Sequence, residues 1–171
     1  MRVVSLCGSR PLDGPVFLLH GGPLRSGERV EYSDVDWEAL DNIRELELEL
    51  TGKQRSLRIW FSVTDGRPYF SCGLRCEDRA LKRWPHYLDE DPRIVVRVAG
   101  KLIEGLAERV AYNSPEFIAA RAHRKTKFDG GDVRSDAERA IHQAIFKWIP
   151  QEEKEQDESS ESGRLYRIVP R

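Results

Sequence analysis

Several cations and hydroxyl side chains lie close together between residues 51 and 61, just ahead of two aromatic residues. The cations are Lys53, Arg55 and Arg58, the hydroxyls are Thr51 and Ser56, and the aromatics are Trp60 and Phe61. A phosphate dianion is held best by charge-assisted donors, such as a guanidinium with an ammonium or hydroxyl beside it. The cluster is therefore a candidate cradle for a phosphorylated cofactor. The alternative is that Lys53 and Arg55 belong to a solvated turn between two strands.

Three further residues could complete such a site. Lys82 could bring another cation from a helix that follows, and Ser71 lies where the neighbouring strand would meet the site. Trp60 and Trp84 could form an apolar wall for the planar ring of a cofactor. The alternative for Trp60 is a place in a dimer interface or second core, and for Trp84 a plug at one end of the fold.

The sequence offers no convincing catalytic residue and no metal site. Tyr69, Tyr87 and His86 are only possibilities for a general acid, so the catalytic residues are unknown. Cys72 and Cys76 are separated by three residues with no second pair of ligands nearby, whereas zinc sites normally have four ligands. We therefore expect two reduced cysteines at the end of a strand.

Composition indicates one globular domain. The chain has 171 residues, of which 39% are hydrophobic and 33% charged, and its formal net charge is −1. From residue 53 to 101 there are eleven Lys and Arg and six Asp and Glu, whereas residues 151–162 hold six acids and one lysine. Binding of nucleic acid is not expected, since the aromatics do not alternate with the cations as a stacking platform requires. No apolar run approaches the roughly 20 residues of a membrane span, so we expect a cytoplasmic protein.

Alternation of apolar and polar residues predicts most of the strands. The predicted strands are 44–50, 57–64, 69–72, 93–98, 101–112 and 165–169, with one more at 15–19. In the first of these, Glu45, Glu47 and Glu49 are expected to face water. In the second, Arg58 and Trp60 lie opposite the core residues and should face a cleft or a partner subunit.

Capping signals predict the helices. The predicted helices are 37–45 after Asp36, 78–89, 115–122 after Ser114, and 135–148, opened by Ser135 and Glu138. The acidic segment 151–162 is expected to be a loop. Consecutive antiparallel strands with a few short helices give an α+β class, most simply a small barrel. We expect a single domain over residues 1–171, with its core at about 37–125.

Three stretches together resemble a known family. They are the Gly-x-x-Arg-x-x-x-x-Trp-Phe run at 52–61, the LKRWPHYLDEDPRIVVRV run at 81–98, and Gly105-x-Ala107. In order and spacing they resemble the split β-barrel flavin-binding proteins, similar to pyridoxamine-phosphate oxidase and the deazaflavin-dependent nitroreductases.

The resemblance implies an antiparallel split β-barrel with flanking short helices, and a homodimer with the cofactor at the subunit interface. It implies FMN, with a deazaflavin as the alternative, and hydride transfer between the reduced cofactor and a small electrophile. A lysine such as Lys125 or Lys127 sometimes lies near the site in this family. The alternative function is a cofactor-free split-barrel dimer that acts as a structural or interaction module.

Overall fold

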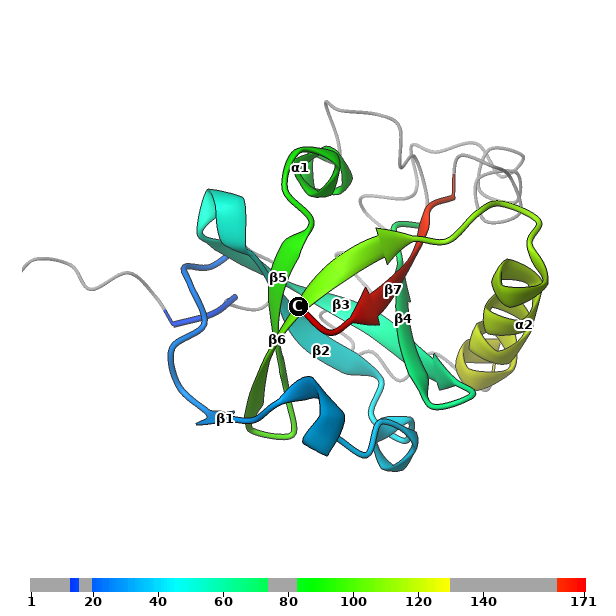
Figure 1. Cartoon of the computed structure of the whole chain (residues 1–171), viewed down its shortest axis with the longest axis horizontal. Helices are drawn as coiled ribbons and strands as arrows, with labels where there is room; N and C mark the ends of the chain where they lie inside the picture. Colours follow the sequence, from blue (N-terminus) through cyan, green and yellow to red (C-terminus); the bar gives the residue numbers. More distant parts are fainter. Residues whose placement is uncertain (1–12, 16–19, 74–82, 130–162) are drawn as a thin grey trace, which may run out of the picture.

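The protein is built around a closed antiparallel barrel, seen in a computed structural model that describes residues 13–15, 20–73, 83–129 and 163–171 (Figure 1). The barrel strands are β2 (Glu45–Leu50), β3 (Arg55–Thr64), β4 (Arg67–Ser71), β5 (Arg93–Val98), β6 (Lys101–Arg109) and β7 (Leu165–Val169). Their order is β6-β5-β2-β3-β4-β7, and β7 pairs again with β6, which closes the barrel. The short strand β1 (Glu28–Arg29) runs parallel to β6. The predicted α+β class and antiparallel barrel are confirmed.

Two tight turns set the register of neighbouring strands. Asp65 and Gly66 join β3 to β4 with φ angles of 51° and 69°, and Ala99 and Gly100 join β5 to β6 with 49° and 75°. Two central residues with positive φ give a turn whose twist matches that of the flanking strands. Both turns lie between strands that the sequence predicts.

The barrel interior is filled by one face of each strand. In β2 the side chains of Leu46, Leu48 and Leu50 are at most 3% exposed, as their alternation predicts. Aromatic residues from β3, β4 and β7 complete the core, where Phe70 stacks on Tyr166 with ring centroids 5.2 Å apart. Burial of this kind is the main stabilising term for a domain of this size.

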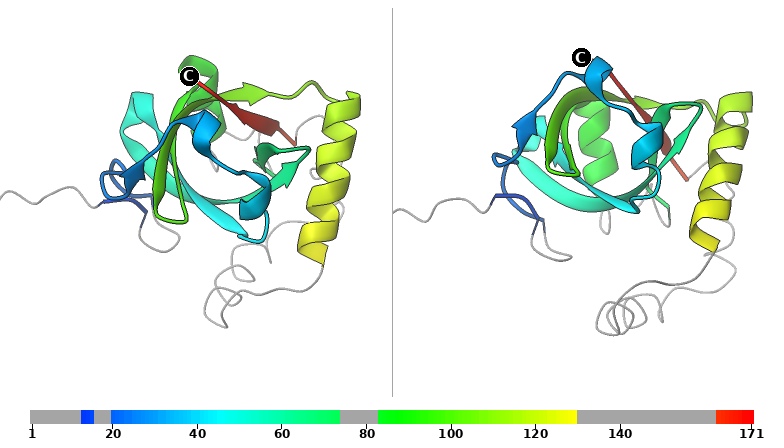
Figure 2. Two further views of the ribbon diagram at one scale, coloured as in Figure 1. Left: turned by 60° about the horizontal axis from the view of Figure 1, so that its bottom comes forward. Right: turned by 90° about the horizontal axis from the view of Figure 1, so that it is seen from below.

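In the described part of the chain, two α-helices flank the barrel, α1 (Trp84–Glu90) and α2 (Pro115–Asp129). The backbone N–H of Phe117 donates to the Ser114 hydroxyl at 3.1 Å, which confirms the predicted cap. The prediction that α2 ends at residue 122 is wrong, because the helix continues along the side of the barrel through residues that pack against β3 (Figure 2).

The short helices are one-turn 3-10 segments, namely η1 (Tyr32–Asp34), η2 (Glu38–Leu40) and η3 (Thr51–Lys53). The prediction of an α-helix over 37–45 is wrong. Asp36 does cap this segment, accepting from the backbone N–H of Ala39 at 3.1 Å, but only η2 forms. The helix ends early because Glu45 pairs with Trp60 in the β2–β3 ladder. Strand β3 begins at Arg55, two residues earlier than predicted.

Cys72, at the end of β4, is disulfide-bonded, so the expectation of a reduced thiol at this position is wrong. Disulfides are typical of oxidising compartments, and the cytoplasmic location therefore stays a prediction.

Some predictions lie outside the described residues. They are Lys82, Cys76, most of the strand at 15–19, the first half of the helix at 78–89, the helix at 135–148 and the acidic segment 151–162. None of the helices in the described part of the chain is long and apolar enough to cross a membrane.

Candidate functional site

Three of the predicted site residues lie along the outside of β3, and we call this surface the β3 face. It comprises Ser56, Arg58 and Trp60 of β3, Glu45 and Glu47 of β2, and Arg97 of β5. Strand β2 lies between β3 and β5, so three neighbouring strands supply these side chains. Arg55, the first residue of β3, pairs with the core residue Leu50 and therefore leaves the other side of the strand. Along β3, a basic end at η3 is followed by a polar middle and by an aromatic end beside α2.

The basic end carries one guanidinium without a carboxylate partner. Arg55 is exposed, and the described residues provide no ion pair for it. The positive charge of Arg55 also acts on His20. Partial burial is the larger cause and this charge the smaller one, and both lower the pKa of the His20 imidazole. Lys53 is already engaged, since its Nζ lies 2.9 Å from Glu90 Oε2 and 4.8 Å from the ring centre of Tyr87.

Ser56 does not present its hydroxyl on this face. Its side chain is fully buried, and its Oγ donates to the Gly22 carbonyl at 2.6 Å. The backbones of Ser56 and Gly21 exchange two hydrogen bonds of 2.9 and 3.1 Å. The segment around Gly21 therefore covers the start of β3 as an extra, local strand pairing.

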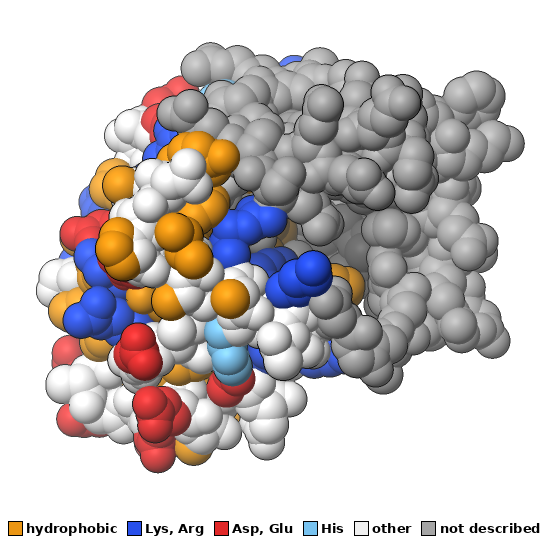
Figure 3. Space-filling view, turned by 90° about the vertical axis from the view of Figure 1, so that its right-hand side faces the viewer, with side chains coloured by type: hydrophobic (Ala, Val, Ile, Leu, Met, Phe, Trp, Pro, Cys, Tyr) orange, Lys and Arg blue, Asp and Glu red, His pale blue; other side chains and the backbone are white. Residues whose placement is uncertain are grey.

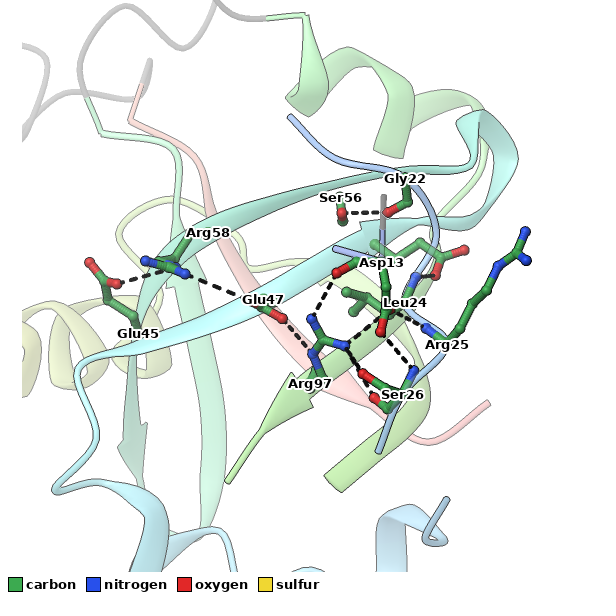
Figure 4. Close-up of polar contacts among 11 residues, drawn as sticks. Asp13, Gly22, Leu24, Arg25, Ser26, Glu45, Glu47, Ser56, Arg58 and Arg97 are labelled. Atoms are coloured by element: carbon green, nitrogen blue, oxygen red, sulfur yellow. Dashed lines mark hydrogen bonds and ion pairs between the residues drawn. The ribbon is translucent and has the colours of Figure 1, made fainter. Parts of the chain in front are cut away.

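The polar middle is a chain of alternating charges (Figure 4). Arg58 lies 3.7 Å from both Glu45 and Glu47, and Arg97 Nε donates to Glu47 at 2.5 Å. Arg97 also reaches Asp13 Oδ1 at 3.1 Å, which ties the N-terminal segment to the barrel. A groove of about 350 Å³ follows this chain of charges. Its lining residues are Glu45, Leu46, Glu47, Arg58, Arg97, Val98, Ala99 and Gly100.

The expectation that all three glutamates of β2 face water is wrong for Glu49. This residue is 7% exposed, and its Oε2 accepts the backbone N–H of Leu24 at 2.7 Å. The N-terminal segment that ends at Ser26 lies across the strand and covers this carboxylate. Asp13 anchors the same segment. A hydrogen bond from the Ser26 side chain, together with one from the backbone N–H of Arg25 and the positive charge of Arg97, lowers the pKa of Asp13 to about 2.

The aromatic end is formed by Trp60 and a residue of α2. The rings of Trp60 and Phe128 stack with centroids 5.0 Å apart and planes 17° apart. The indole Nε1 donates to Glu45 Oε1 at 2.9 Å, which links this end to the polar middle. The guanidinium of Arg44 lies 5.7 Å from the Trp60 ring, and that of Arg124 lies 4.8 Å from the Phe128 ring.

These neighbours of Trp60 do not appear among the residues that the sequence singles out. The missing signal is the length of α2, because Arg124 and Phe128 lie four residues apart on its last turns. Residues at this spacing share one side of a helix. Had the helix been predicted to continue past residue 122, this pair would have been assigned to one surface.

Lys127, a weaker candidate, is a structural residue here. Its ammonium donates to Asp41 Oδ1 at 2.9 Å and to the carbonyls of Ile43 and Phe61 at 2.8 and 2.9 Å. These three bonds use all three N–H donors of the ammonium group. Lys125, by contrast, is exposed on α2.

The remaining predicted residues divide between the core and the aromatic end. Trp84 is 8% exposed and packs against Phe70 and Tyr166, at centroid distances of 6.1 and 6.0 Å, so it plugs the barrel. Ser71 is half-buried and lies one residue beyond the Phe61–Phe70 pair, level with Trp60. The β3 face therefore holds Arg58 and Trp60, with Ser71 beside it, and Arg55 lies at the start of β3 on the other side of the strand.

The possible proton donors are not placed on this face. Tyr69 is 2% exposed and its hydroxyl donates to Glu116 Oε1 at 2.8 Å. Burial, helped by this hydrogen bond, raises the pKa of Tyr69 to about 12. His86 is also buried, and Tyr87 contacts Lys53 beyond the basic end. The catalytic residues thus stay unassigned.

No family model matches the chain, and no curated protein matches it. Among solved structures, this chain is similar to a conserved hypothetical protein from Mycobacterium tuberculosis, at 17% identity and a TM-score of 0.46. The match covers 86% of this chain and 84% of that chain. It is also similar to HutZ, the haem storage protein from Vibrio cholerae, at 11% identity and a TM-score of 0.48. The match covers 78% of this chain and 86% of that chain. A putative pyridoxamine 5′-phosphate oxidase from Listeria innocua is similar at 18% identity and a TM-score of 0.38. This match covers 77% of this chain and 86% of that chain.

These similar structures include a protein of the class that the sequence resembles. At such identities and TM-scores the similarity gives no argument about ligand or reaction. What this chain binds has to be argued from its own residues.

Proposed function

We propose that this protein binds a flavin nucleotide along the β3 face, with FMN preferred to a deazaflavin. One observation carries the proposal: the chemical groups along β3 follow the order of the groups in the ligand. The free guanidinium of Arg55, which leaves the first residue of β3 on the other side of the strand, is followed on the β3 face by donors and acceptors at Arg58 and Glu45, and then by the aromatic pair of Trp60 and Phe128. Flavin mononucleotide presents a phosphate, a polyhydroxyl chain and a planar ring in the same order.

The phosphate would lie at the basic end. Arg55 offers a planar fork of donors that matches two phosphate oxygens, and no described carboxylate neutralises it. Lys53 lies in the adjacent turn, and its contact with Glu90 is solvent-exposed, so breaking it costs little. The two residues together supply the charge that a phosphate dianion requires.

The hydroxyl-bearing chain of the ligand would cross the polar middle. Arg58 lies 3.7 Å from each of its two carboxylates, which is longer than a hydrogen bond, so hydroxyls could enter between these groups. From Arg55 to Trp60 the strand rises about 17 Å, which gives room for an extended chain between the phosphate and the ring. The groove of about 350 Å³ lies alongside.

The ring would contact the aromatic end. Trp60 is half-buried and already stacked on one partner, Phe128, at 5.0 Å, so its position is fixed before a ligand arrives. Fixed aromatic surfaces bind planar ligands at a low entropic cost. When bound, the flavin supplies the redox chemistry, and hydride transfer to a small electrophile is the proposed reaction.

A second candidate function is a cofactor-free barrel that serves as a structural or interaction module. It is favoured by the internal pairing of the cations, because Lys53, Arg58 and Arg97 all contact carboxylates of the same chain. Ser56, which could have donated to a phosphate, is buried beneath Gly22. In this alternative, Arg55 is a solvated residue of the turn.

A titration of the purified protein separates the two functions. FMN, a deazaflavin and hemin would each be added while tryptophan fluorescence and the melting temperature are followed. The proposal expects FMN to raise the melting temperature and quench fluorescence, with most of the quenching lost in Trp60→Phe. If saturating FMN and deazaflavin produce neither change, the cofactor-free function replaces the proposal.

A further inference from the structure

A second groove, separate from the β3 face, lies over the outside of β6. On one edge of this strand, β1 pairs with Lys101 and Leu102, and β7 pairs with the residues from Leu106 to Arg109. Figure 2 shows the C-terminal end of β7 beside the segment that follows β1. A groove of about 480 Å³ lies between these two segments, and we call it the β6 groove. Its volume falls within the range of roughly 300–1,000 Å³ that is typical of small-molecule sites.

One carboxylate in the β6 groove holds two guanidiniums. Glu104 Oε1 accepts from Arg29 Nη1 at 3.2 Å, and its Oε2 accepts from Arg171 Nη1 at 3.0 Å. Neither arginine side chain donates another hydrogen bond to the described residues. A guanidinium has five N–H donors, so most of the donors of both groups remain for a ligand. Their planar forks match the two oxygens of a carboxylate.

A second carboxylate, that of Glu31, stands beside Arg29. The chain is extended here, so two residues separated by one position leave it on the same side. Glu31 is exposed, and the described residues provide no ion pair for it. It therefore offers an acceptor for an ammonium group. With two arginines and two glutamates among its lining residues, the β6 groove is neutral as a whole.

Apolar side chains complete the walls of the groove. They belong to Val30, Tyr32, Leu102 and Pro170. The walls are fixed from both ends, because the Val30 N–H donates to the Leu102 carbonyl at 3.1 Å and the Tyr32 hydroxyl donates to the Ile168 carbonyl at 2.9 Å. A site that is formed before its ligand arrives binds at a low entropic cost.

Mixed charge alone does not distinguish this groove. Charged and apolar side chains are also interspersed on the side of the molecule that carries α2 (Figure 3). The β6 groove differs because unused donors, an unpaired carboxylate and apolar walls surround one cavity. Such a combination selects a small ligand that has both charges and an apolar part.

We propose that the β6 groove binds a free α-amino acid with an apolar side chain. The carboxylate of the ligand accepts from Arg29 and Arg171, its ammonium donates to Glu31, and its side chain lies against Tyr32 and Leu102. A zwitterion matches the neutral groove, whereas a simple anion is repelled by Glu31 and a simple cation by the arginines. This inference does not rest on the proposed function, because the β6 groove and the β3 face have no residue in common.

Isothermal titration calorimetry of the full chain with three related compounds tests the proposal. L-Leucine should bind with a dissociation constant in the millimolar range or below. N-acetyl-L-leucine lacks the ammonium and L-leucinamide lacks the carboxylate, so each should bind about tenfold more weakly or worse. L-Alanine, which has both charges but a small side chain, should also bind more weakly than leucine.

Variants locate the binding. Arg29→Gln and Glu31→Gln should each weaken binding of leucine about tenfold, because each removes a charged partner of the ligand. Arg109→Gln and Glu28→Gln make the same changes at exposed positions of β6 and β1 outside the groove. These matched controls should bind leucine as the wild type does.

Three results would overturn the inference. The first is leucine that gives neither heat nor a change in the NMR chemical shifts of the Val30 and Glu104 amides. The second is equal binding of leucine and N-acetyl-L-leucine, which would make the groove a site for simple anions. The third is unchanged binding in both Arg29→Gln and Glu31→Gln, which would place leucine elsewhere. Circular dichroism would verify that both variants are folded.

Discussion

The ammonium of Lys127 lies 2.9 Å from the carboxylate of Asp41 and joins α2 to the segment that leads into β2. Only 9% of the lysine side chain is exposed, so this contact is made largely out of water. Asp41 also accepts from the backbone N–H of Val63 at 2.7 Å and lies 2.7 Å from His123 Nε2. Burial raises the pKa of Asp41, but these hydrogen bonds outweigh it and lower the pKa overall.

Lys127→Met should therefore destabilise the fold by about 2 kcal/mol, because it leaves a partly buried carboxylate without its cation and two carbonyls without a donor. Urea unfolding would measure the change in the free energy of unfolding. Lys125→Met, which changes an exposed lysine of the same helix, is the control and should cost less than about 0.5 kcal/mol. Equal effects of the two changes would contradict the structural role of Lys127.

The anchor at Asp13 predicts a dependence of stability on pH. The pKa of Asp13 in the folded chain is about 2, below its ordinary value of 3.8, so the carboxylate stabilises the fold fully above about pH 4. This contribution is lost progressively as the pH falls from 3.8 towards 2, because the proton binds more tightly to the unfolded chain.

Asp13→Asn should thus melt at a lower temperature than the wild type at pH 6, and the difference should shrink as the pH falls towards 2. Thermal unfolding at several pH values would measure it. A difference that stays constant over this range would show that the charge of Asp13 does not hold the N-terminal segment.

Arg55→Ala should weaken binding of FMN about tenfold or more, since it removes charge-assisted hydrogen bonds to the phosphate. Isothermal titration calorimetry would give the dissociation constant. Arg109→Ala, which removes an exposed arginine of β6, is the control and should bind FMN as the wild type does. Unchanged affinity in Arg55→Ala would make Arg55 a residue of a solvated turn.

Gly105 lies where β6 passes close to the last strand. A Cβ atom at this position would lie 2.8 Å from the Val169 carbonyl oxygen and 3.2 Å from a methyl carbon of Ile168. Gly105→Ala should therefore destabilise the barrel by about 2 kcal/mol, through a forced shift of backbone. Chemical denaturation would measure this, with Glu104→Ala on the exposed side of β6 as the control. A cost no larger than that of the control would mean that β6 and β7 can move apart.

The sequence predicts the barrel strands well because each buries one face. The leucines of β2 alternate strictly with glutamates, and the two tight turns have glycine at the second central position. Such signals are local, and they depend only on neighbours within a few residues. The closed antiparallel barrel follows from several such strands in succession.

The covering of the β3 face could not be predicted in the same way. Alternation correctly places Ser56 and Glu49 opposite the core, but it cannot tell that Gly22 and Leu24 lie over them. These contacts join residues 25 or more positions apart, through a segment with no regular pattern of its own. The aromatic partner of Trp60 was missed for a related reason, because Phe128 reaches it only from the end of a longer helix.

Strand β7 has a consequence for how the chain is made. It is the last strand in sequence, yet it lies between β4 and β6, pairing Phe70 with Tyr166 and Ala107 with Ile168. During synthesis, the edges of β4 and β6 that pair with β7 therefore stay unpaired until residues 165–169 have been made and can fold. Open strand edges invite pairing with other chains, so the nascent protein is exposed to aggregation in this interval.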